Sequence, residues 1–287
     1  MVQARDGNQC GRGEGTPIYY NGETAEGCLA QIKALPPDVN RASLQQILAP
    51  GAARNAVDCA LWDLDAMRAG VPLWQLAKLA PPRSLVTAMT VSLGRPEQME
   101  SAARELSRCT GLIKIKLSGE DDLARVAAVR RGAPDARLIV DANESWTNRD
   151  IAAEASALVP FGVELIEQPV RQGEDHLLDG IVSPIPLGAD ESLHDRSDLA
   201  RCLGRYQAIN IKLDKAGGLT EALALRAEAQ ALGFKVMVGC MLATSLGITP
   251  AFLVAQDADW VDLDGALLLA KDRDRPLILK GGLLSYS

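Results

Sequence analysis

Charged side chains end several of the apolar runs of this sequence, and their spacing is regular. The six residues are Lys116, Asp141, Glu167, Asp190, Lys212 and Asp262. Successive members lie 22 to 26 residues apart, except that the last follows after 50 residues, which is two such steps. Polar strand ends could simply meet solvent, but six charged groups in register with one repeating unit indicate a shared site. The chain has only two histidines, so acid–base chemistry would rest largely on carboxylates and lysines.

Asp141, Glu167 and Asp190 end three consecutive runs, so we expect them to lie side by side. Three carboxylates held this close would repel one another unless a cation joined them. Their oxygen atoms, with water or substrate completing the shell, suit an octahedral Mg²⁺ ion. The alternative is that the three are ordinary helix caps or surface ion pairs. The spacing favours one magnesium site in each subunit.

The lysines suggest a pair of bases. Leu112-Ile-Lys-Ile-Lys-Leu117 alternates strictly, so Lys114 and Lys116 point to one side of a strand and the isoleucines to the other. We expect neighbouring lysines and a dication to lower the pKa of a lysine, which could then act as a base. Ala208-Ile-Asn-Ile-Lys-Leu213 alternates likewise and turns Lys212 inward. If these two strands face each other, Lys116 and Lys212 can invert one carbon, because one base removes the proton and the other returns it to the opposite face.

The elements that would position these residues alternate along the chain. Eight strands are expected, at Leu85–Leu93, Leu112–Leu117, Arg137–Asp141, Val163–Glu167, Ile185–Asp190, Ala208–Leu213, Lys235–Gly239 and Trp260–Leu263. Alanine-rich segments with helical spacing lie between them, at Asp121–Arg131, Arg149–Leu158 and Thr220–Leu232. This alternation predicts an α/β barrel with its site at the C-terminal rim of the strands. An open doubly wound sheet is the competing fold, but it would call for a Gly-x-Gly-x-x-Gly turn, which the sequence lacks.

The two ends of the chain do not follow this pattern. Residues 1–82 have a glycine-rich start and then helical patterns at Thr24–Leu35, Ser43–Leu48 and Arg54–Ala69, which predict a separate lobe. The barrel should span residues 83–265. Residues 266–287 contain no further strand–helix unit, and we expect them to pack back on the N-terminal lobe.

Composition and charge narrow the class of protein. A net charge of −7 argues against a nucleic acid or an anionic membrane as partner. The six cysteines are scattered without a Cys-x-x-Cys pair, which is typical of buried thiols in a reducing compartment. The start has no signal-peptide pattern, and no segment is long and apolar enough to cross a bilayer. We therefore expect a cytoplasmic protein with a small-molecule substrate, present as a homo-oligomer.

Five short motifs connect these features with a known family. They are Lys-Ile-Lys at 114–116, Asp-Ala-Asn at 141–143, Glu-Gln-Pro at 167–169, Ala-Asp-Glu-Ser at 189–192 and Asn-Ile-Lys-Leu-Asp-Lys-Ala-Gly-Gly at 210–218. In order and spacing, over nearly the whole chain, they resemble the muconate-lactonizing subgroup of the enolase superfamily. The segment after the seventh strand has no histidine, which excludes the mandelate-racemase-like branch.

The resemblance implies a fold and a set of roles. The fold would be a (β/α)₇β barrel with an α+β capping domain. Mg²⁺ would bind Asp141, Glu167 and Asp190, Lys116 and Lys212 would be the catalytic acid and base, and Lys114 and Asn143 would support them. Stabilisation of an enediolate by lysine and Mg²⁺ is an established pattern of this superfamily and is taken over from the resemblance.

Asp262-Leu-Asp264 on the last expected strand narrows the activity. It is similar to the Asp-x-Asp of dipeptide epimerases, in which the pair holds the α-ammonium of the substrate. Alternation places both aspartates on one face, which suits a cationic group. We also expect Cys240 and Met241, after the seventh strand, to contact the substrate. The implied reaction is a two-base 1,1-proton transfer at the α-carbon of the C-terminal residue, with the Ala-Glu dipeptides of peptidoglycan recycling as the leading substrates.

Other activities stay open. A cycloisomerase, an o-succinylbenzoate synthase or an N-acylamino acid racemase acts on substrates without a free α-ammonium, so the two aspartates would lack a purpose. A truncated, non-catalytic scaffold is the alternative outside enzymes, and the intact motifs argue against it. Gly11-Arg-Gly-Glu14 and Tyr20-Asn-Gly-Glu23 are similar to the segment that follows the opening hairpin of the family. We therefore expect that hairpin and its mobile loop, which helps to choose the side chain, to be missing before Met1.

Overall fold

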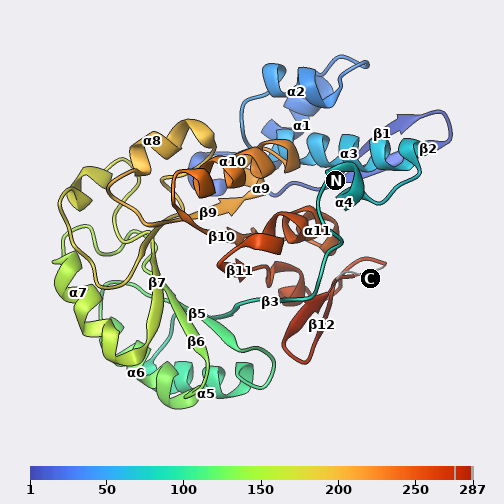
Figure 1. Ribbon diagram of the computed structural model, residues 1–287. Helices are drawn as coiled ribbons and strands as arrows, with labels where there is room; N and C mark the ends of the chain where they lie inside the picture. The colour runs from blue at the N-terminus through green and yellow to red at the C-terminus, as the bar shows by residue number, and fades with distance from the viewer. Residues whose placement is uncertain (275, 286–287) are drawn as a thin grey trace.

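The computed structural model describes residues 1–274 and 276–285 and shows a small N-terminal lobe against a barrel (Figure 1). Eight parallel strands form one sheet in the order β11-β10-β9-β8-β7-β6-β5-β4. They are β4 Met89–Val91, β5 Leu112–Lys116, β6 Arg137–Asp141, β7 Val163–Glu167, β8 Leu187–Ala189, β9 Ala208–Lys212, β10 Lys235–Gly239 and β11 Trp260–Asp262. The two edges also meet, because the Ala88 N–H donates to the Val261 carbonyl with an N···O distance of 2.7 Å. The sheet is therefore a nearly closed barrel, as predicted, and not an open doubly wound sheet.

Helices cover the outside of the barrel. They are α5 Pro96–Leu106, α6 Asp122–Gly132, α7 Ile151–Leu158, α8 Leu199–Cys202, α9 Leu213–Ala216, α10 Leu219–Ala231 and α11 Ser245–Val254. Three of them, α6, α7 and α10, lie at the segments whose periodicity predicts a helix. Ile113 and Ile115 of β5 are fully buried in the main core with residues of these helices. A smaller apolar cluster, which includes Leu112 and Ile139, lies on the opposite side of the strands and fills the barrel below its rim. Within the described residues, no helix could span a membrane.

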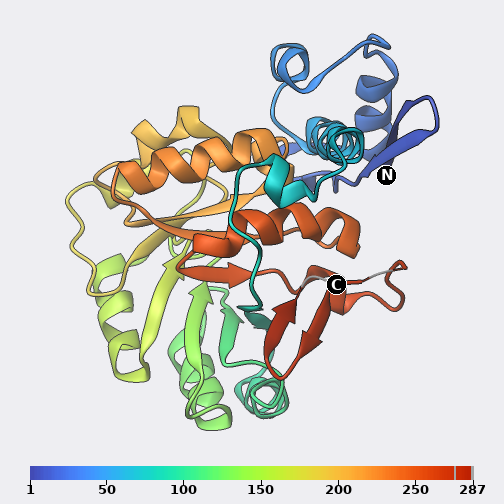
Figure 2. The same ribbon diagram turned by 45° about the vertical axis from the view of Figure 1, so that its right-hand side comes forward.

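The N-terminal lobe contains α1 Ala25–Lys33, α2 Arg41–Ile47, α3 Ala52–Ala69 and α4 Leu73–Leu76. Strands β1 Val2–Asp6 and β2 Gln9–Gly13 form an antiparallel hairpin against α3 (Figure 2). The sequence analysis did not predict these two strands, and the absence of the family's opening hairpin before Met1 stays a prediction. A Cβ on Gly11 or Gly13 would lie within 2.2 Å of a backbone oxygen of α3, so the close packing requires glycine there. Glycine is depleted in strands, so the same two glycines make these strands difficult to recognise in the sequence.

The C-terminal segment forms a second small sheet. Strands β12 Ile278–Lys280 and β13 Leu283–Ser285 pair antiparallel with each other, and β13 also pairs antiparallel with β3 Leu85–Val86 (Figure 2). The predicted first strand is thus divided, because β3 pairs with β13 whereas β4 pairs with β5. Leu277 and Leu284 are buried in the main core. The segment therefore packs on the barrel, whereas we expected it to pack back on the lobe. Its residues 271–274 do line a shallow hollow with Arg12 of β2.

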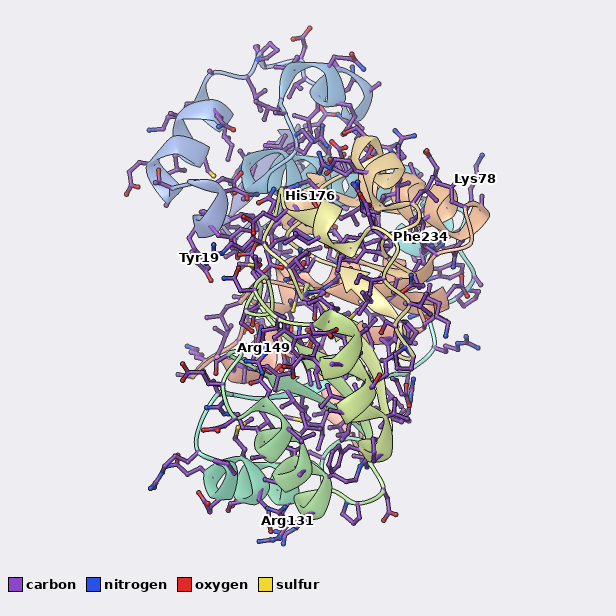
Figure 3. The ribbon with its side chains drawn as sticks, turned by 90° about the vertical axis from the view of Figure 1, so that its left-hand side faces the viewer. Tyr19, Lys78, Arg131, Arg149, His176 and Phe234 are labelled. Atoms are coloured by element: carbon purple, nitrogen blue, oxygen red, sulfur yellow. The ribbon has the colours of Figure 1, made fainter. Side chains whose placement is uncertain are left out.

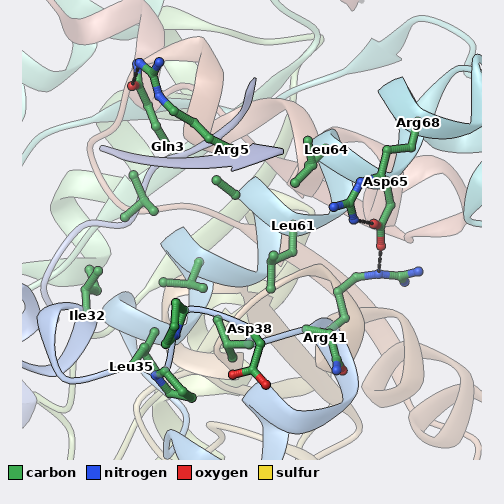
Figure 4. Close-up of a pocket in the computed structure, with 17 residues that line it drawn as sticks. Gln3, Arg5, Ile32, Leu35, Asp38, Arg41, Leu61, Leu64, Asp65 and Arg68 are labelled. Atoms are coloured by element: carbon green, nitrogen blue, oxygen red, sulfur yellow. Dashed lines mark hydrogen bonds and ion pairs between the residues drawn. The ribbon is translucent and has the colours of Figure 1, made fainter. Parts of the chain in front are cut away.

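The lobe also has a cavity of its own, of about 410 Å³, between β1, the α1–α2 connection and α3 (Figure 4). Leu35, Leu61 and Leu64 form apolar walls of the cavity, and Asp65 forms ion pairs with Arg41 and Arg68 at one end of it. None of the predicted site residues lines it.

Candidate active site

The register of the parallel strands brings their C-terminal residues to one level. Lys116 of β5 lies beside Asp141 of β6, and Asp141 lies beside Glu167 of β7. Asp190 follows the end of β8 directly. At most 1% of each of these three acids is exposed. The predicted carboxylates are therefore neighbours on the barrel rim, and all are shielded from solvent.

Lys114 is the cation at the centre of this group. Its Nζ lies 2.6 Å from Glu167 Oε2, 3.1 Å from Asp141 Oδ2 and 2.9 Å from Asp262 Oδ2. Only 3% of the side chain is exposed. Lys114 thus ties β5 to β6, β7 and β11 just below the rim.

Lys116 and Lys212 lie on strands that face each other, because β6, β7 and β8 separate β5 from β9 in the eight-stranded barrel. Lys116 Nζ is 2.7 Å from Asp141 Oδ2, and Lys212 Nζ is 2.5 Å from Asp190 Oδ2. Each predicted base therefore pairs with one acid of the trio. The space between the two ammonium groups lies above Lys114.

The pKa values of Lys114 and Lys212 are raised, whereas we expected lysine pKa values here to be lowered. Burial alone would lower the pKa of Lys212, but the Asp190 and Glu167 carboxylates outweigh it and raise that pKa. The pKa of Lys114 is likewise raised, because Asp141, Asp262 and Glu167 together outweigh the effect of burial. Lys114 does lower the pKa of Lys212, as predicted for neighbouring lysines, but the carboxylates outweigh it; the effect of a dication stays a prediction. Each ammonium lies closer to carboxylates than the prediction assumed.

The acids of the trio differ in their proton affinity. Burial would raise the pKa of Asp141, but Lys114 and Lys116 outweigh it and lower the pKa to about 2. The pKa of Asp190 is also held well below its ordinary value by three lysines in spite of burial. In contrast, burial and the neighbouring Asp141 raise the pKa of Glu167 to about 7. Lys114 touches Glu167 but shares its charge among three acids, so it does not offset these two effects.

The rim residues fit a magnesium ion in their chemistry. As the side chains lie, no group of three or more His, Cys, Asp or Glu residues in the described part of the chain surrounds a common point as a metal ion requires. Lys114 instead bridges Asp141 and Glu167. The donors are nonetheless carboxylate oxygens on neighbouring strand ends, which suit a hard cation. Glu167 Oε2 is buried and accepts no hydrogen bond of good geometry from any described residue. Asp141, Glu167 and Asp190 stay our predicted ligands.

Three residues that the sequence analysis missed hold the acids in place. Asn210 Nδ2 donates to Glu167 Oε1 at 2.6 Å. Gln168 Oε1 accepts the backbone N–H of Asp190 at 2.8 Å. Lys215 Nζ lies 2.6 Å from Asp190 Oδ1, and burial lowers the pKa of Lys215. All three lie inside the motifs quoted above. Their place in those motifs was the signal that could have identified them.

Asn143 and Glu191 complete this side of the rim. The backbone N–H of Asn143 donates to Asp141 Oδ1 at 3.0 Å, and its side chain lies 3.5 Å from Glu191 Oε1. Glu191 Oε2 is buried without a hydrogen-bond partner among the described residues. Burial, followed by Asp190 and Asp141, raises the pKa of Glu191 to about 8. Glu191 is thus a fourth acid beside the predicted trio.

Asp262 and Asp264 are buried on the β11 side of the rim, with 6% of each exposed. Asp264 Oδ2 accepts the backbone N–H and the hydroxyl of Thr90, at 3.0 and 2.8 Å. Burial, followed by Asp262, raises the pKa of Asp264 to about 6. Asp262 Oδ1 is buried and accepts no hydrogen bond within the described chain.

Cys240 and Met241 follow β10 and lie beside this pair. Cys240 Sγ donates weakly to the Asp262 carbonyl at 3.5 Å, and burial raises the pKa of the thiol. The Met241 carbonyl lies so close to Gly265 that a Cβ there would be 2.6 Å from it. The two residues thus pack against the β11 loop that carries Asp264.

The lobe reaches the rim through residues 14–23, which we call the strap. Asp214 Oδ1, in α9 just after β9, accepts the Thr16 N–H at 2.8 Å, and Glu14 Oε1 accepts the Thr244 N–H at 3.0 Å. The 3₁₀ turn η1 Tyr19–Asn21 lies in the strap, and Asn21 Nδ2 is 2.7 Å from a ring nitrogen of His194 in the loop after β8. The strap is thus fastened to loops that follow three different strands.

Comparisons with known proteins agree with this arrangement. Residues 13–77 match the family model described as mandelate racemase / muconate lactonizing enzyme, N-terminal domain, and residues 98–283 match enolase C-terminal domain-like. The chain is 45% identical over 289 residues to the L-Ala-D/L-Glu epimerase of Escherichia coli, which covers 99% of this chain and 90% of the relative. It is 42% identical over 291 residues to an N-acetyl-D-glutamate racemase of a Pseudoalteromonas species, with 99% and 92% covered.

Solved structures resemble it throughout. An enolase family member from Agrobacterium tumefaciens with homology to dipeptide epimerases, crystallised with sodium and L-Ala-L-Glu, superposes with a TM-score of 0.95 at 48% identity, over 99% of this chain and 88% of that one. The dipeptide epimerase of Enterococcus faecalis in complex with Mg and L-Leu-L-Tyr has a TM-score of 0.88 at 31% identity, over 97% and 86%. Both the lobe and the barrel thus have their counterparts, and the chain belongs to the mandelate racemase / muconate lactonizing enzyme family of the enolase superfamily, in which its relatives are dipeptide epimerases and an acylamino acid racemase.

Proposed function

We propose that this protein is a Mg²⁺-dependent dipeptide epimerase that inverts the α-carbon of the C-terminal residue of Ala-Glu-type dipeptides. One observation carries the proposal: Lys116 and Lys212 stand on opposite strands of the rim with buried carboxylates between them. A carbon held in that space would have one amine on each face. The similarity to the L-Ala-D/L-Glu epimerase of E. coli supports this substrate class.

The lysines would carry the proton. The amine of one lysine takes the α-proton onto its Nζ, and the ammonium of the other gives a proton to the opposite face. Because either lysine can act first, the same pair serves both directions. Bound by Asp141, Glu167 and Asp190, Mg²⁺ would supply positive charge that stabilises the negative charge developing on the terminal carboxylate of the substrate. EDTA should abolish turnover and Mg²⁺ should restore it, and full activity in metal-free buffer would contradict the assignment.

Asp262 and Asp264 would bind the α-ammonium of the dipeptide. Asp262 Oδ1 is a buried acceptor without a partner in the described chain, and the pair lies on the β11 side of the space between the lysines. A protonated amine between two carboxylates gains charge-assisted hydrogen bonds. An N-acylated substrate has no such charge and would leave both acids without a cationic partner from the substrate.

A specific observation favours a second candidate, an N-acylamino acid racemase. The chain is 42% identical to an N-acetyl-D-glutamate racemase, and Lys114 already neutralises one oxygen of Asp262. The two activities share the lysines and differ at the amine. We propose to incubate the protein with L-Ala-L-Glu, its N-acetylated form and N-acetyl-L-glutamate in D₂O with Mg²⁺, and to follow α-proton exchange by NMR. The epimerase requires the free dipeptide to react fastest by at least about tenfold. Equal or faster exchange of the acylated compounds would favour the racemase.

The proposed setting is cytoplasmic recycling of peptidoglycan peptides, as a homo-oligomer. The scattered thiols support a reducing compartment. Light scattering coupled to gel filtration measures the oligomeric state directly, and a mass of 30.6 kDa would contradict an oligomer.

A further inference from the structure

The geometry of the rim leaves one direction for the side chain of the epimerised residue. If the proposed function holds, the exchanging proton lies on the axis between Lys116 and Lys212. The terminal carboxylate then points to the acids of β6, β7 and β8, and the peptide nitrogen points toward β11, where Asp262 lies. Lys114, with 3% of its side chain exposed, closes the barrel beneath. The side chain therefore points out of the barrel, toward the strap.

The strap carries a hydroxyl group at this place that has no partner. The Tyr20 OH is buried, and none of the described residues forms a hydrogen bond with it. It belongs to the turn η1, which the contact between Asn21 and His194 holds against the loop after Asp190. Burial of a hydroxyl without a hydrogen-bond partner is unfavourable, so a group that lies there without a partner points to a ligand.

The surroundings of Tyr20 keep it a hydrogen-bond donor. Burial raises the pKa of its phenol, and the nearby Asp190 raises that pKa further, so the group stays protonated at any physiological pH. Lys212 acts in the opposite direction and does not reverse the shift. The contact between Asn21 and His194 holds the turn that carries Tyr20 against the loop after β8, on the side of the rim where Asp190 lies.

We infer that the Tyr20 hydroxyl binds the substrate by donating a hydrogen bond to an oxygen acceptor on the side chain of the epimerised residue. The inference rests on the proposed function and deepens it. It predicts that the strap selects side chains that end in a carboxylate or an amide over apolar side chains of the same length. The competing possibility is that Tyr20 turns to Glu191 Oε2, a buried acceptor without a partner among the described residues, and has a structural role only.

Tyr20→Phe removes the hydroxyl and keeps the ring, and Tyr19→Phe is the matched control. The two rings are neighbours, 5.3 Å apart between centroids, but 77% of Tyr19 is exposed, at the outer edge of the lobe (Figure 3). The kcat/KM of each protein is measured for L-Ala-L-Glu and for L-Ala-L-Met, whose side chain is similar in length but has no good acceptor. Tyr20→Phe should lower the value for L-Ala-L-Glu by about ten- to a hundredfold and change that for L-Ala-L-Met by less than about twofold. Tyr19→Phe should leave both values within about twofold.

The ratio between the two substrates makes the test independent of folding, because a partly unfolded variant loses activity on both alike. An equal loss on both substrates, or no loss on either, would overturn the inference. The same ratio is measured for N-acetyl-L-glutamate and N-acetyl-L-methionine. If only the acylated pair reacts, the proposed function fails, and the ratio within that pair still decides the role of Tyr20. If calorimetry detects binding of neither pair, both proposals fall.

Discussion

Replacement of Lys114 by methionine would test the buried charge cluster most directly. Lys114 Nζ touches three carboxylates at 2.6 to 3.1 Å, and all three are at least nine-tenths buried. Loss of one partner from a buried ion pair costs about 3–5 kcal/mol, because the remaining charge is left without compensation. Lys114→Met keeps the length of the aliphatic chain, so the change isolates the charge from the packing. We expect the free energy of unfolding in metal-free buffer to fall by about 3–5 kcal/mol, measured by urea denaturation.

Lys116→Met is the control, because among the described residues Lys116 forms an ion pair with Asp141 alone, and 34% of its side chain is exposed. A partly exposed pair is worth less than about 1 kcal/mol, so this variant should be nearly as stable as the parent protein. Saturating MgCl₂ should reduce the deficit of Lys114→Met, because a ligand that binds only the folded state stabilises it and a dication would neutralise the same acids. Two results would refute this reasoning: equal stability of both variants, or a deficit of Lys114→Met that is unchanged by Mg²⁺.

Four further variants test the site and its surroundings. Lys116→Ala and Lys212→Ala should each abolish epimerisation, and each should still exchange the α-proton of one epimer in D₂O; near-normal epimerisation by either would contradict the two-base assignment. Asp264→Asn keeps the shape and removes one charge, so kcat/KM for free dipeptides should fall about ten- to a hundredfold, with Mg²⁺ affinity unchanged in a calorimetric titration. Burial raises the pKa of Asp214 to about 7, so its folded form binds a proton more tightly than the unfolded chain does. The stability that this proton provides is present at low pH and is lost as the pH rises from about 4 through 7, by at most about 4 kcal/mol. Asp214→Asn should flatten this part of the stability profile, and an unchanged slope in urea unfolding from pH 5 to 8 would show the reasoning to be wrong.

The barrel and its reactive groups could be predicted because each depends on local patterns. Strict alternation in the segment before Lys116 fixes which side chains turn inward, and the regular unit length brings Asp141 and Glu167 to one level. Features that depend on close approach were not visible. The hairpin at residues 2–13 contains glycines that the contact with α3 requires. The direction of the lysine pKa shifts depends on distances of 2.5 to 3.1 Å between charged atoms, which the spacing of residues along the chain cannot specify.

Our proposals place the type of reaction and the choice of substrate in different parts of this chain. The lysines and acids sit on barrel strands, where period and register fix their positions. The strap reaches the same space from the other end of the sequence: its contact between Thr16 and Asp214 joins residues 198 positions apart, and that between Glu14 and Thr244 joins residues 230 positions apart. No periodic pattern in the sequence predicts such contacts, since each depends on how the lobe packs on the barrel. Our inference implies that the lobe can change the accepted side chain without disturbing the two bases; among the relatives, one is an L-Ala-D/L-Glu epimerase and another is a hydrophobic dipeptide epimerase. Variation in the strap, at Tyr20 first, is where we expect side-chain preference to change while proton exchange at the α-carbon persists.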